Sequence, residues 1–380
     1  MVRERVAEFS VEYVQALDEE GNADEAELPD VSDEQLLELY RLMRLSRRVD
    51  ERAVALQRRG ELGTYAPGIG QEAAQVGSAT ALKPEGWMVP SFREGAAFLT
   101  RGTPIHRLLW YSMGMEEGAE VSGANFPPSI PVGSQSLHAA GVGWGQEITG
   151  ADEATLTYFG DGATSQGDVA EAMNVAGVLD AHCVFFCQNN QWAISVPRSG
   201  QSRAETLAQK AIAAGIEGVQ VDGNDVLGVL AVTRDALESA REGDPVLIEA
   251  QTYRRSMHTT SDDPRAYRTE EEEAEWEARD PIARFETYLR DEGLLDDERE
   301  ESIGEEIEEL VADEIDRAKE GQEQVVPAEM FDYVFAEAPP ELRRQKEEFE
   351  RTGDDEPASA EGGLPGETEA GGGEVADRDE

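Results

Sequence analysis

The residues with the clearest potential for chemistry follow two predicted strands in the middle of the chain. Gly160-Asp161-Gly162 comes directly after the strand-like run 155–159, and Asn190 follows the apolar run 184–187. The carboxyl ends of neighbouring parallel strands form the ligand crevice of an open α/β sheet, so we expect Asp161 and Asn190 to lie there together. Carboxylate and amide oxygens suit Mg²⁺, which usually keeps phosphate oxygens among its ligands, and the glycines let the backbone approach that phosphate. The spacing therefore predicts a diphosphate held through a divalent metal.

The segments around these residues resemble a known enzyme family. In order along the chain they are residues 160–168, 188–195, 207–210, 221–223, 252–254, 258–263 and 266–268. They resemble the alpha subunit of the decarboxylating component of 2-oxo acid dehydrogenase complexes, and the bacterial pyruvate dehydrogenase type most closely. The resemblance covers about residues 31–348 and depends on several independent motifs in the family's order.

The resemblance implies thiamine diphosphate and Mg²⁺ as cofactors. By position, Asp161, Asn190 and the backbone carbonyl of Trp192 correspond to the metal ligands of the family. Gly162 and Ala163 correspond to the turn that contacts the diphosphate.

Other positions that correspond to family cofactor contacts lie outside these two strand ends. Arg93 falls where the family has a Tyr-Arg pair against the diphosphate, although Phe92 here replaces the tyrosine and removes its hydroxyl. Val132 falls where the family lines the aminopyrimidine pocket, and Arg254 where it has an arginine that reaches the diphosphate.

His258 is expected to be the catalytic histidine, together with Arg254. It corresponds to the family's loop histidine, which assists acyl transfer, and imidazole can exchange protons near neutral pH. We expect His106 and His182 to be structural and leave the role of His138 open. The family's further histidine before its Gly-x-Gln motif is absent between residues 113 and 131.

The resemblance also implies partners. The glutamate that activates the cofactor belongs to the beta subunit in this family, so we expect an α₂β₂ heterotetramer that is inactive without its beta chains. The reaction would be oxidative decarboxylation of a 2-oxo acid and reductive acylation of a lipoyl domain on the core acyltransferase. Pyruvate is the expected substrate, with branched-chain 2-oxo acids and acetoin as alternatives. A non-catalytic scaffold is disfavoured because Asp161, Asn190, Arg254 and His258 are all intact.

The composition indicates the solution conditions in which the protein is expected to work. The chain carries 81 acidic and 33 basic residues, a formal net charge of −48, and only four of the basic residues are lysine. Such a chain repels nucleic acid and itself, and it is expected to need salt, as in a halophilic cytoplasm. We expect no membrane span, because no apolar run reaches 18 residues, and no secretory signal. Cys183 and Cys187 are expected to be buried thiols.

The elements that must position these residues alternate in type. Strands are predicted at 155–159, 184–187, 219–221 and 246–250, and helices at 168–178, 204–214 and 226–241. This alternation predicts an α/β fold with a doubly wound, mostly parallel sheet. Helical extensions are expected on both sides: one opens at a capping box formed by Ser32 and Gln35, and another carries an apolar stripe from Ile303 to Ile315. Arg47, Arg48 and Arg52 belong to the helix that opens at Ser32, and they would face solvent or a partner.

The ends of the chain differ in composition from this domain. Residues 1–30 are acidic and weakly patterned, which predicts a flexible arm. Residues 349–380 are rich in Gly, Glu, Asp and Pro with almost no apolar anchor, which predicts a disordered acidic tail.

Overall fold

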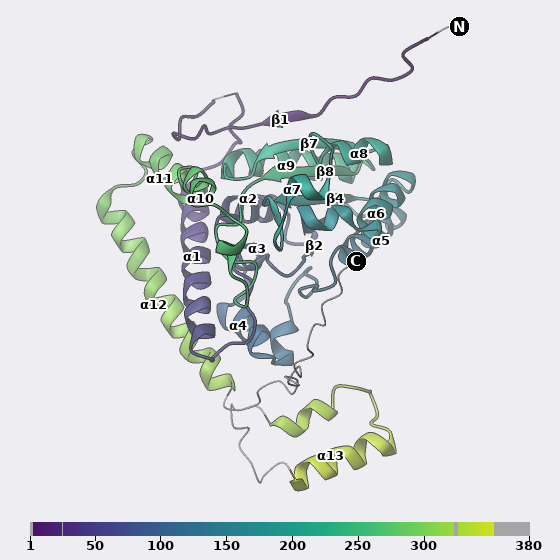
Figure 1. Cartoon of the computed structure of the whole chain (residues 1–380), viewed down its shortest axis with the longest axis vertical. Coiled ribbons are helices and arrows are strands. Elements are labelled where there is room, and N and C mark those ends of the chain that lie inside the picture. Colours follow the sequence, from purple (N-terminus) through teal and green to yellow (C-terminus); the bar gives the residue numbers. More distant parts are fainter. Residues whose placement is uncertain (1–2, 25, 323–325, 353–380) are drawn as a thin grey trace, which may run out of the picture. The chain divides into compact units, whose positions relative to one another are not determined.

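The computed structural model describes residues 3–24, 26–322 and 326–352. The chain forms two compact units, Met1–Glu323 and Gln324–Glu380, which we describe separately. In the first unit, six parallel strands form one sheet in the order β1-β7-β8-β4-β3-β2 (Figure 1). The strands are β1 (Glu12–Val14), β2 (Trp87–Val89), β3 (Thr155–Gly160), β4 (Cys183–Asn189), β7 (Glu217–Asp222) and β8 (Val246–Gln251), and a separate antiparallel pair comprises β5 (Trp192–Ala193) and β6 (Val196–Pro197).

Helices cover both faces of this sheet, because side chains alternate between the faces along each strand. Leu156 of β3 and Val184 of β4 pack with apolar residues of α2 (Glu72–Ala81) and α9 (Val226–Arg241) on one face. Phe159 and Phe185 pack on the other face with residues of α5 (Ser134–Thr149), α6 (Gly167–Val178) and α8 (Gln209–Ala214). The doubly wound, mostly parallel α/β fold is therefore confirmed.

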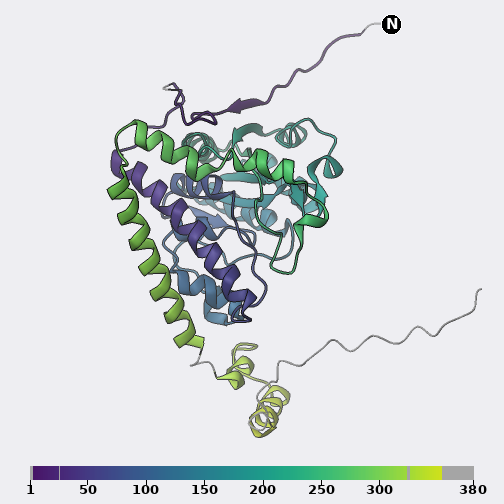
Figure 2. The ribbon, with the colours of Figure 1, turned by 60° about the vertical axis from the view of Figure 1, so that its left-hand side comes forward.

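Long helices from the two ends of the unit lie side by side at its left in Figure 1, and Figure 2 shows the same arrangement from a second direction. They are α1 (Asp33–Arg58) and α12 (Asp297–Gln322). The predicted capping box starts α1, with the Ser32 hydroxyl accepting from the Gln35 backbone N–H and the Gln35 side chain accepting from the Ser32 N–H. The predicted apolar stripe buries Ile307, Val311 and Ile315 of α12.

The remaining helices of this unit are short. They are α3 (Gly95–Thr100), α4 (Ile105–Met113), α7 (Arg198–Gln201), α10 (Glu270–Glu277) and α11 (Pro281–Asp291), with single-turn helices η1 (Glu116–Ala119), η2 (Asp161–Ser165) and η3 (Pro264–Ala266).

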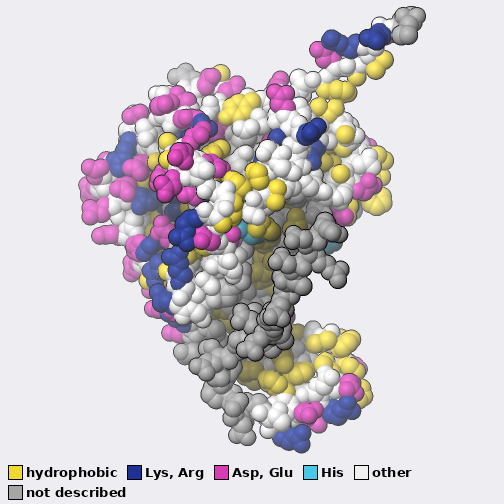
Figure 3. All heavy atoms as spheres, viewed as in Figure 1, with side chains coloured by type: hydrophobic (Ala, Val, Ile, Leu, Met, Phe, Trp, Pro, Cys, Tyr) yellow, Lys and Arg dark blue, Asp and Glu magenta, His cyan; other side chains and the backbone are white. Residues whose placement is uncertain are grey.

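The surface is acidic, with arginines set among the carboxylates. Figure 3 shows Asp and Glu side chains over much of the upper left, and Lys and Arg side chains in a stripe near α1 and α12. The arginines of α1 contact carboxylates of this chain: Arg47 pairs with Glu72 and Asp280, and Arg48 pairs with Glu308. These two side chains therefore have partners inside the unit.

Three sequence expectations need correction. The predicted helix 204–214 begins only at Gln209, and strands β1 and β2 were not predicted. The expected flexible arm, residues 1–30, contains β1, which pairs with β7, and the buried residues Ala16 and Leu17. This part of the arm is held in place by the Asp225 carboxylate, which accepts hydrogen bonds from the backbone N–H groups of Ala16 and Leu17 at 2.6 and 2.8 Å.

The second unit consists of η4 (Pro327–Phe331) and α13 (Pro340–Thr352), with the Phe331 and Phe349 rings 5.6 Å apart. The division at residue 323 differs from the expected single domain 31–348. Helix α13 extends into the expected tail as far as Thr352, and the rest of that tail lies outside the described residues. In the part of the chain that the structure describes, no helix is both long and apolar enough to cross a membrane.

Candidate functional site

Three neighbouring strands bring the predicted site residues to one edge of the sheet. Asp161 follows β3, Asn190 follows β4, and Arg254 lies three residues beyond β8. In the register, Gly160 is opposite Gln188, and Asn189 is opposite Gln251, so the three strand ends are level. A cavity of about 770 Å³ opens at this edge. All ten predicted site residues line it: Phe92, Arg93, Val132, Asp161, Gly162, Ala163, Asn190, Trp192, Arg254 and His258.

Asp161 is an almost fully buried carboxylate with one unsatisfied oxygen. Its Oδ2 atom has no hydrogen-bond partner among the described residues, and the side chain is 1 % exposed. Burial raises the pKa of Asp161 to about 6, and the Arg254 guanidinium opposes this rise. A buried anionic oxygen without a partner is costly, so the position suits a cation ligand.

Gly162 must be glycine for a packing reason. A Cβ at this position would lie 2.6 Å from the Cβ of Ala193, because the β5 turn rests directly on η2. The same close approach brings the backbone at 192–193 beside Asp161 in the cavity.

Asn190 is oriented by residues that the sequence analysis did not single out. Its Nδ2 donates to Gln71 Oε1 at 2.9 Å, and its Oδ1 accepts from the Trp192 backbone N–H at 3.3 Å. Gln191 between them has a φ of +74°, a left-handed conformation that turns the backbone sharply at this point. The Trp192 carbonyl accepts from Arg254 Nη1 at 3.3 Å. Carboxylate, amide and backbone oxygens thus meet at the cavity wall.

Two buried arginines converge on His258. Arg93 Nη2 lies 3.0 Å and Arg254 Nη1 lies 3.2 Å from His258 Nδ1. A guanidinium can only donate, so Nδ1 accepts from both and the ring proton resides on Nε2. Burial, Arg93 and Arg254 together lower the pKa of His258 to about 4. Burial, and then Arg254, also lower the pKa of Arg93 to about 10.

The His258 loop is fastened to the domain at several points. The His258 backbone N–H donates to Asp262 Oδ2 at 2.7 Å, and the Tyr267 hydroxyl donates to the same oxygen at 2.5 Å. Arg254 Nη2 donates to the Ile194 carbonyl at 2.7 Å and to Tyr267 Oη at 3.0 Å. The Phe92 ring meets the His258 ring edge-on, with 6.0 Å between centroids. The ring is thereby held at the cavity wall.

Two further carboxyl groups stand close to the cavity. Glu94 lines it, accepts from Gln188 Nε2 at 2.7 Å, and has a pKa raised to about 7 by burial. Asp50 accepts from the hydroxyl of cavity-lining Tyr65 at 2.6 Å, and burial raises its pKa to about 7 as well. Glu94 adjoins Arg93 in sequence, which was the only available signal for it; Asp50 and Gln71 had none, because only the fold brings them here.

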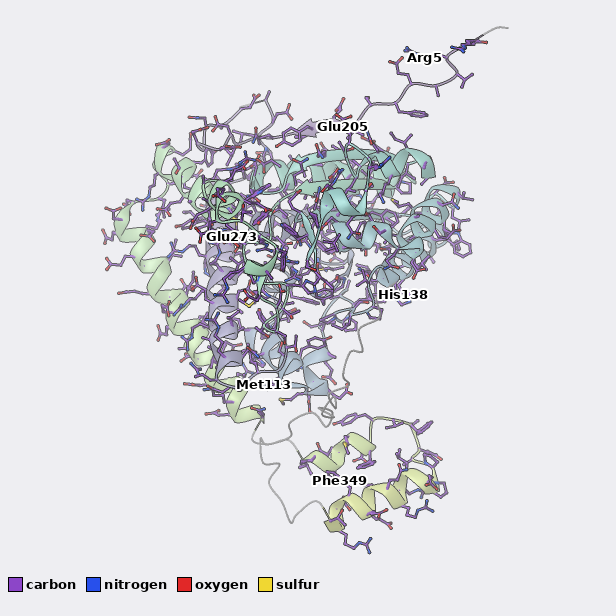
Figure 4. The ribbon with its side chains drawn as sticks, in the orientation of Figure 1. Arg5, Met113, His138, Glu205, Glu273 and Phe349 are labelled. Carbon is purple, nitrogen blue, oxygen red and sulfur yellow. The ribbon has the colours of Figure 1, made fainter. Side chains whose placement is uncertain are left out.

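The other histidines lie outside the cavity. His106 is buried beside Glu314, with Nδ1 and the carboxylate oxygen 2.7 Å apart, and His182 Nε2 lies 3.0 Å from Glu147. His138, which the sequence left open, is exposed on α5, where its ring stands 6.4 Å from that of Phe126 (Figure 4). It is not among the residues that line the cavity.

Comparison with known proteins gives consistent similarities along most of the chain. Residues 40–326 match the family described as "Dehydrogenase E1 component". The chain is 43% identical over 327 residues to the 3-methyl-2-oxobutanoate dehydrogenase subunit alpha of Mycobacterium tuberculosis, covering 84% of this chain and 88% of that one. It is 42% identical over 341 residues to the pyruvate dehydrogenase E1 component subunit alpha of Staphylococcus epidermidis, covering 88% and 92%. The Staphylococcus aureus counterpart is 41% identical over the same length.

Proposed function

Because this chain belongs to the dehydrogenase E1 component family, we propose that it is the alpha subunit of a thiamine diphosphate-dependent 2-oxo acid dehydrogenase that works with a beta subunit. The reaction is oxidative decarboxylation of a 2-oxo acid, followed by reductive acylation of a lipoyl group carried by the core acyltransferase. The observation that carries the proposal is the unsatisfied Asp161 oxygen beside two buried arginines in one cavity. The family is thiamine diphosphate-dependent, and this arrangement fits a diphosphate with its cation.

Asp161, Asn190 and the Trp192 carbonyl would hold Mg²⁺. The donor set is all oxygen, which is what Mg²⁺ prefers, and the unsatisfied Asp161 Oδ2 is available to it. Binding a cation would also compensate the buried Asp161 charge and keep the carboxylate ionised.

Arg93 and Arg254 would neutralise the diphosphate. Both guanidiniums are buried, and burial lowers both pKa values; repulsion from Arg254 lowers the pKa of Arg93 further, and repulsion from Arg268 lowers that of Arg254. A dianionic group at the cavity wall relieves that repulsion, and guanidinium is well shaped for phosphate oxygens. Binding of the cofactor should therefore stabilise the folded chain.

When bound, thiamine diphosphate supplies the nucleophilic carbon and the electron sink for loss of CO₂. His258 would serve the later acyl transfer. Its Nδ1 is occupied by the two arginines, so the Nε2–H is the group free to donate a hydrogen bond into the cavity. The residues that line the cavity include the apolar Leu108, Val121 and Ile130, which would help to exclude water from it.

Pyruvate is the proposed substrate, with a branched-chain 2-oxo acid as the second candidate. The second is kept because relatives carrying the two names are almost equally similar to this chain. The test is turnover by the chain reconstituted with its cognate beta subunit, using pyruvate, 3-methyl-2-oxobutanoate and larger 2-oxo acids with an artificial electron acceptor. A higher kcat/KM for pyruvate supports the first candidate, and a higher value for 3-methyl-2-oxobutanoate supports the second. Absence of turnover with every 2-oxo acid would contradict the proposed function itself.

The setting proposed for the protein is a salt-rich cytoplasm. Its support is the net charge of −48 and the scarcity of lysine. The two cysteines are buried free thiols, as expected for a reducing compartment.

A further inference from the structure

The turn that carries the Trp192 carbonyl has an unfavourable backbone conformation on both sides of that residue. Gln191 has a φ of +74° and Ile194 has a φ of +54°. Within the described chain, Asp180 is the one other non-glycine residue with a positive φ. The left-handed region is uncommon for any side chain and a clear outlier for a β-branched one such as isoleucine. A turn of this kind persists only where surrounding groups hold it in place.

The hydrogen bonds of the Trp192 backbone are long. Its N–H donates to Asn190 Oδ1 at 3.3 Å, and its carbonyl accepts from Arg254 Nη1 at 3.3 Å. Both partners are also groups to which the proposed function gives a cofactor contact, Asn190 with the cation and Arg254 with the diphosphate. An anchor that is independent of the cofactor must therefore be sought on the side chain of Trp192.

The Trp192 side chain is fixed by groups that lie around its ring. The residue is buried, and its ring lies 5.1 Å from the Tyr267 ring, centroid to centroid. The Arg268 guanidinium lies 5.9 Å from the Trp192 ring centroid. The indole Nε1–H donates to Glu272 Oε1 at 2.9 Å. A buried indole has one donor and needs an acceptor for it, so Glu272 satisfies the only polar group of this side chain and sets the orientation of the ring.

Glu272 reaches Trp192 from the first turn of α10, 80 positions further along the chain. The turn is capped by Thr269, whose Oγ1 accepts from the Glu272 backbone N–H at 3.2 Å. The next residue, Glu273, which Figure 4 labels, lies 3.8 Å from Nη1 of Arg268, the cation beside the indole. Helix α10 buries none of its own residues. Its first turn thus supplies carboxylates to the surroundings of Trp192 and adds little to the core.

We propose that Glu272 is a positioning residue for the cation site: by fixing the indole of Trp192, it holds the strained turn that carries the Trp192 carbonyl. The inference rests on the proposed function, in which this carbonyl is the third protein ligand of Mg²⁺. Glu272 is not among the residues that line the cavity, so it acts through Trp192. The role requires an acceptor for the indole N–H and does not require a negative charge.

The test uses the heterotetramer formed with the cognate beta subunit. Calorimetry measures the Mg²⁺ concentration that gives half-maximal binding of thiamine diphosphate. Glu272→Ala should raise this concentration by about tenfold, because a group that orients a metal ligand is lost. Glu272→Gln should remain near wild type, since its amide oxygen still accepts from the indole. Glu271→Ala removes the same charge from an exposed neighbouring position of α10 and serves as the matched control.

Trp192→Phe tests the same contact from its other side. It keeps an aromatic ring and the backbone carbonyl but removes the indole N–H, so it should raise the Mg²⁺ requirement as Glu272→Ala does. The double variant should be no worse than Trp192→Phe alone, because both changes remove one interaction. If Glu272→Ala fails to fold or assemble, as shown by thermal unfolding and light scattering, Trp192→Phe and Glu272→Gln still decide the question.

The outcomes separate a positioning role from simple attachment of α10. If Glu272→Ala lowers the melting temperature but keeps the wild-type Mg²⁺ requirement, Glu272 only attaches the helix and the proposal is overturned. It is also overturned if Glu272→Gln needs as much Mg²⁺ as Glu272→Ala, or if the effects of the two single variants add. If the wild-type heterotetramer shows no Mg²⁺-dependent binding of thiamine diphosphate, the proposed function fails first, and the positioning role fails with it.

Discussion

At the scale of single residues, the site is defined by charges that the chain leaves uncompensated. Among the described residues, Asp161 keeps a buried oxygen without a partner, and Arg93 and Arg254 both donate to His258 rather than to a carboxylate. Unpaired buried charge is destabilising, so such an arrangement is retained where a ligand completes it. The identities of these residues were predictable from spacing and family resemblance. Their mutual contacts were not, since residues 93 and 258 are joined only by the fold.

Replacing Asp161 by alanine should weaken binding of thiamine diphosphate with Mg²⁺ by more than about tenfold, because one metal ligand is lost. The fold should be retained, since Asp161 Oδ2 makes no hydrogen bond to any residue that the structure describes. Calorimetry on the assembled heterotetramer measures the affinity. Asp152→Ala removes an equal charge at an exposed position and serves as the control. Unchanged affinity in Asp161→Ala would remove the metal assignment.

His258 should titrate far below an ordinary histidine. Its pKa is lowered to about 4 by burial and two guanidiniums, so Arg93→Gln should raise it toward 6.5 by removing one positive charge. Because the folded-state pKa of about 4 lies below the ordinary value of 6.5, His258 contributes folding stability that is fully present above pH 6.5. That contribution is lost as the pH falls through 4. Imidazole NMR of the isolated chain, assigned with His258→Gln, measures the value. A His258 resonance that titrates at or above 6.5 would contradict this account of the arginines.

At the scale of elements, the strands that carry the site were predictable, and those at the sheet edges were not. The runs that became β3, β4, β7 and β8 are apolar and alternate with helical segments, which is the pattern of a buried parallel sheet. β1 has only three residues in an acidic stretch and owes its place to pairing with β7 and to the Asp225 carboxylate. Similarly, residues 204–208 lack helix because Glu249 accepts from the Leu207 and Ala208 backbone N–H groups, a contact visible only in three dimensions.

The contact between η2 and the β5 turn should tolerate no added carbon. Gly162→Ala would place a Cβ 2.6 Å from Ala193, so we expect a loss of stability of about 1–3 kcal/mol and weaker cofactor binding as the turn moves away from Asp161. Gly167→Ala, at the start of α6, meets nothing within 4 Å and should be neutral or slightly stabilising. Thermal unfolding and calorimetry of both variants give the comparison. Equal behaviour of the two would show that this close approach does not shape the site.

At the scale of the whole molecule, two properties matter most: the large negative charge and an apolar helix face that is exposed to solvent. Arginines of α1 pair with carboxylates of α12, yet a net charge of −48 remains to be screened. The cavity would provide groups for the proposed diphosphate and cation, while Leu137, Trp144 and Ile148 give α5 an apolar face that is exposed among the described residues. Composition alone indicated the first property. The exposed apolar face of α5 required the structure, because a face that is buried within the chain would show the same pattern of apolar residues in the sequence.

The melting temperature of the chain should rise steeply between dilute buffer and molar KCl, because screening relieves repulsion among its uncompensated carboxylates. Sucrose at equal osmolality serves as the control for excluded-solute effects and should give a smaller rise. A melting temperature that is flat across the KCl series would remove the halophilic interpretation.

The central claim is that this chain holds the diphosphate half of a cofactor site that a beta subunit completes. The most direct measurement is CO₂ release from pyruvate and from 3-methyl-2-oxobutanoate, with thiamine diphosphate, Mg²⁺ and an artificial electron acceptor, by this chain alone, by the beta subunit alone and by the two together. We predict release from at least one of the two acids by the mixture only. Substantial release by this chain alone would contradict the claim.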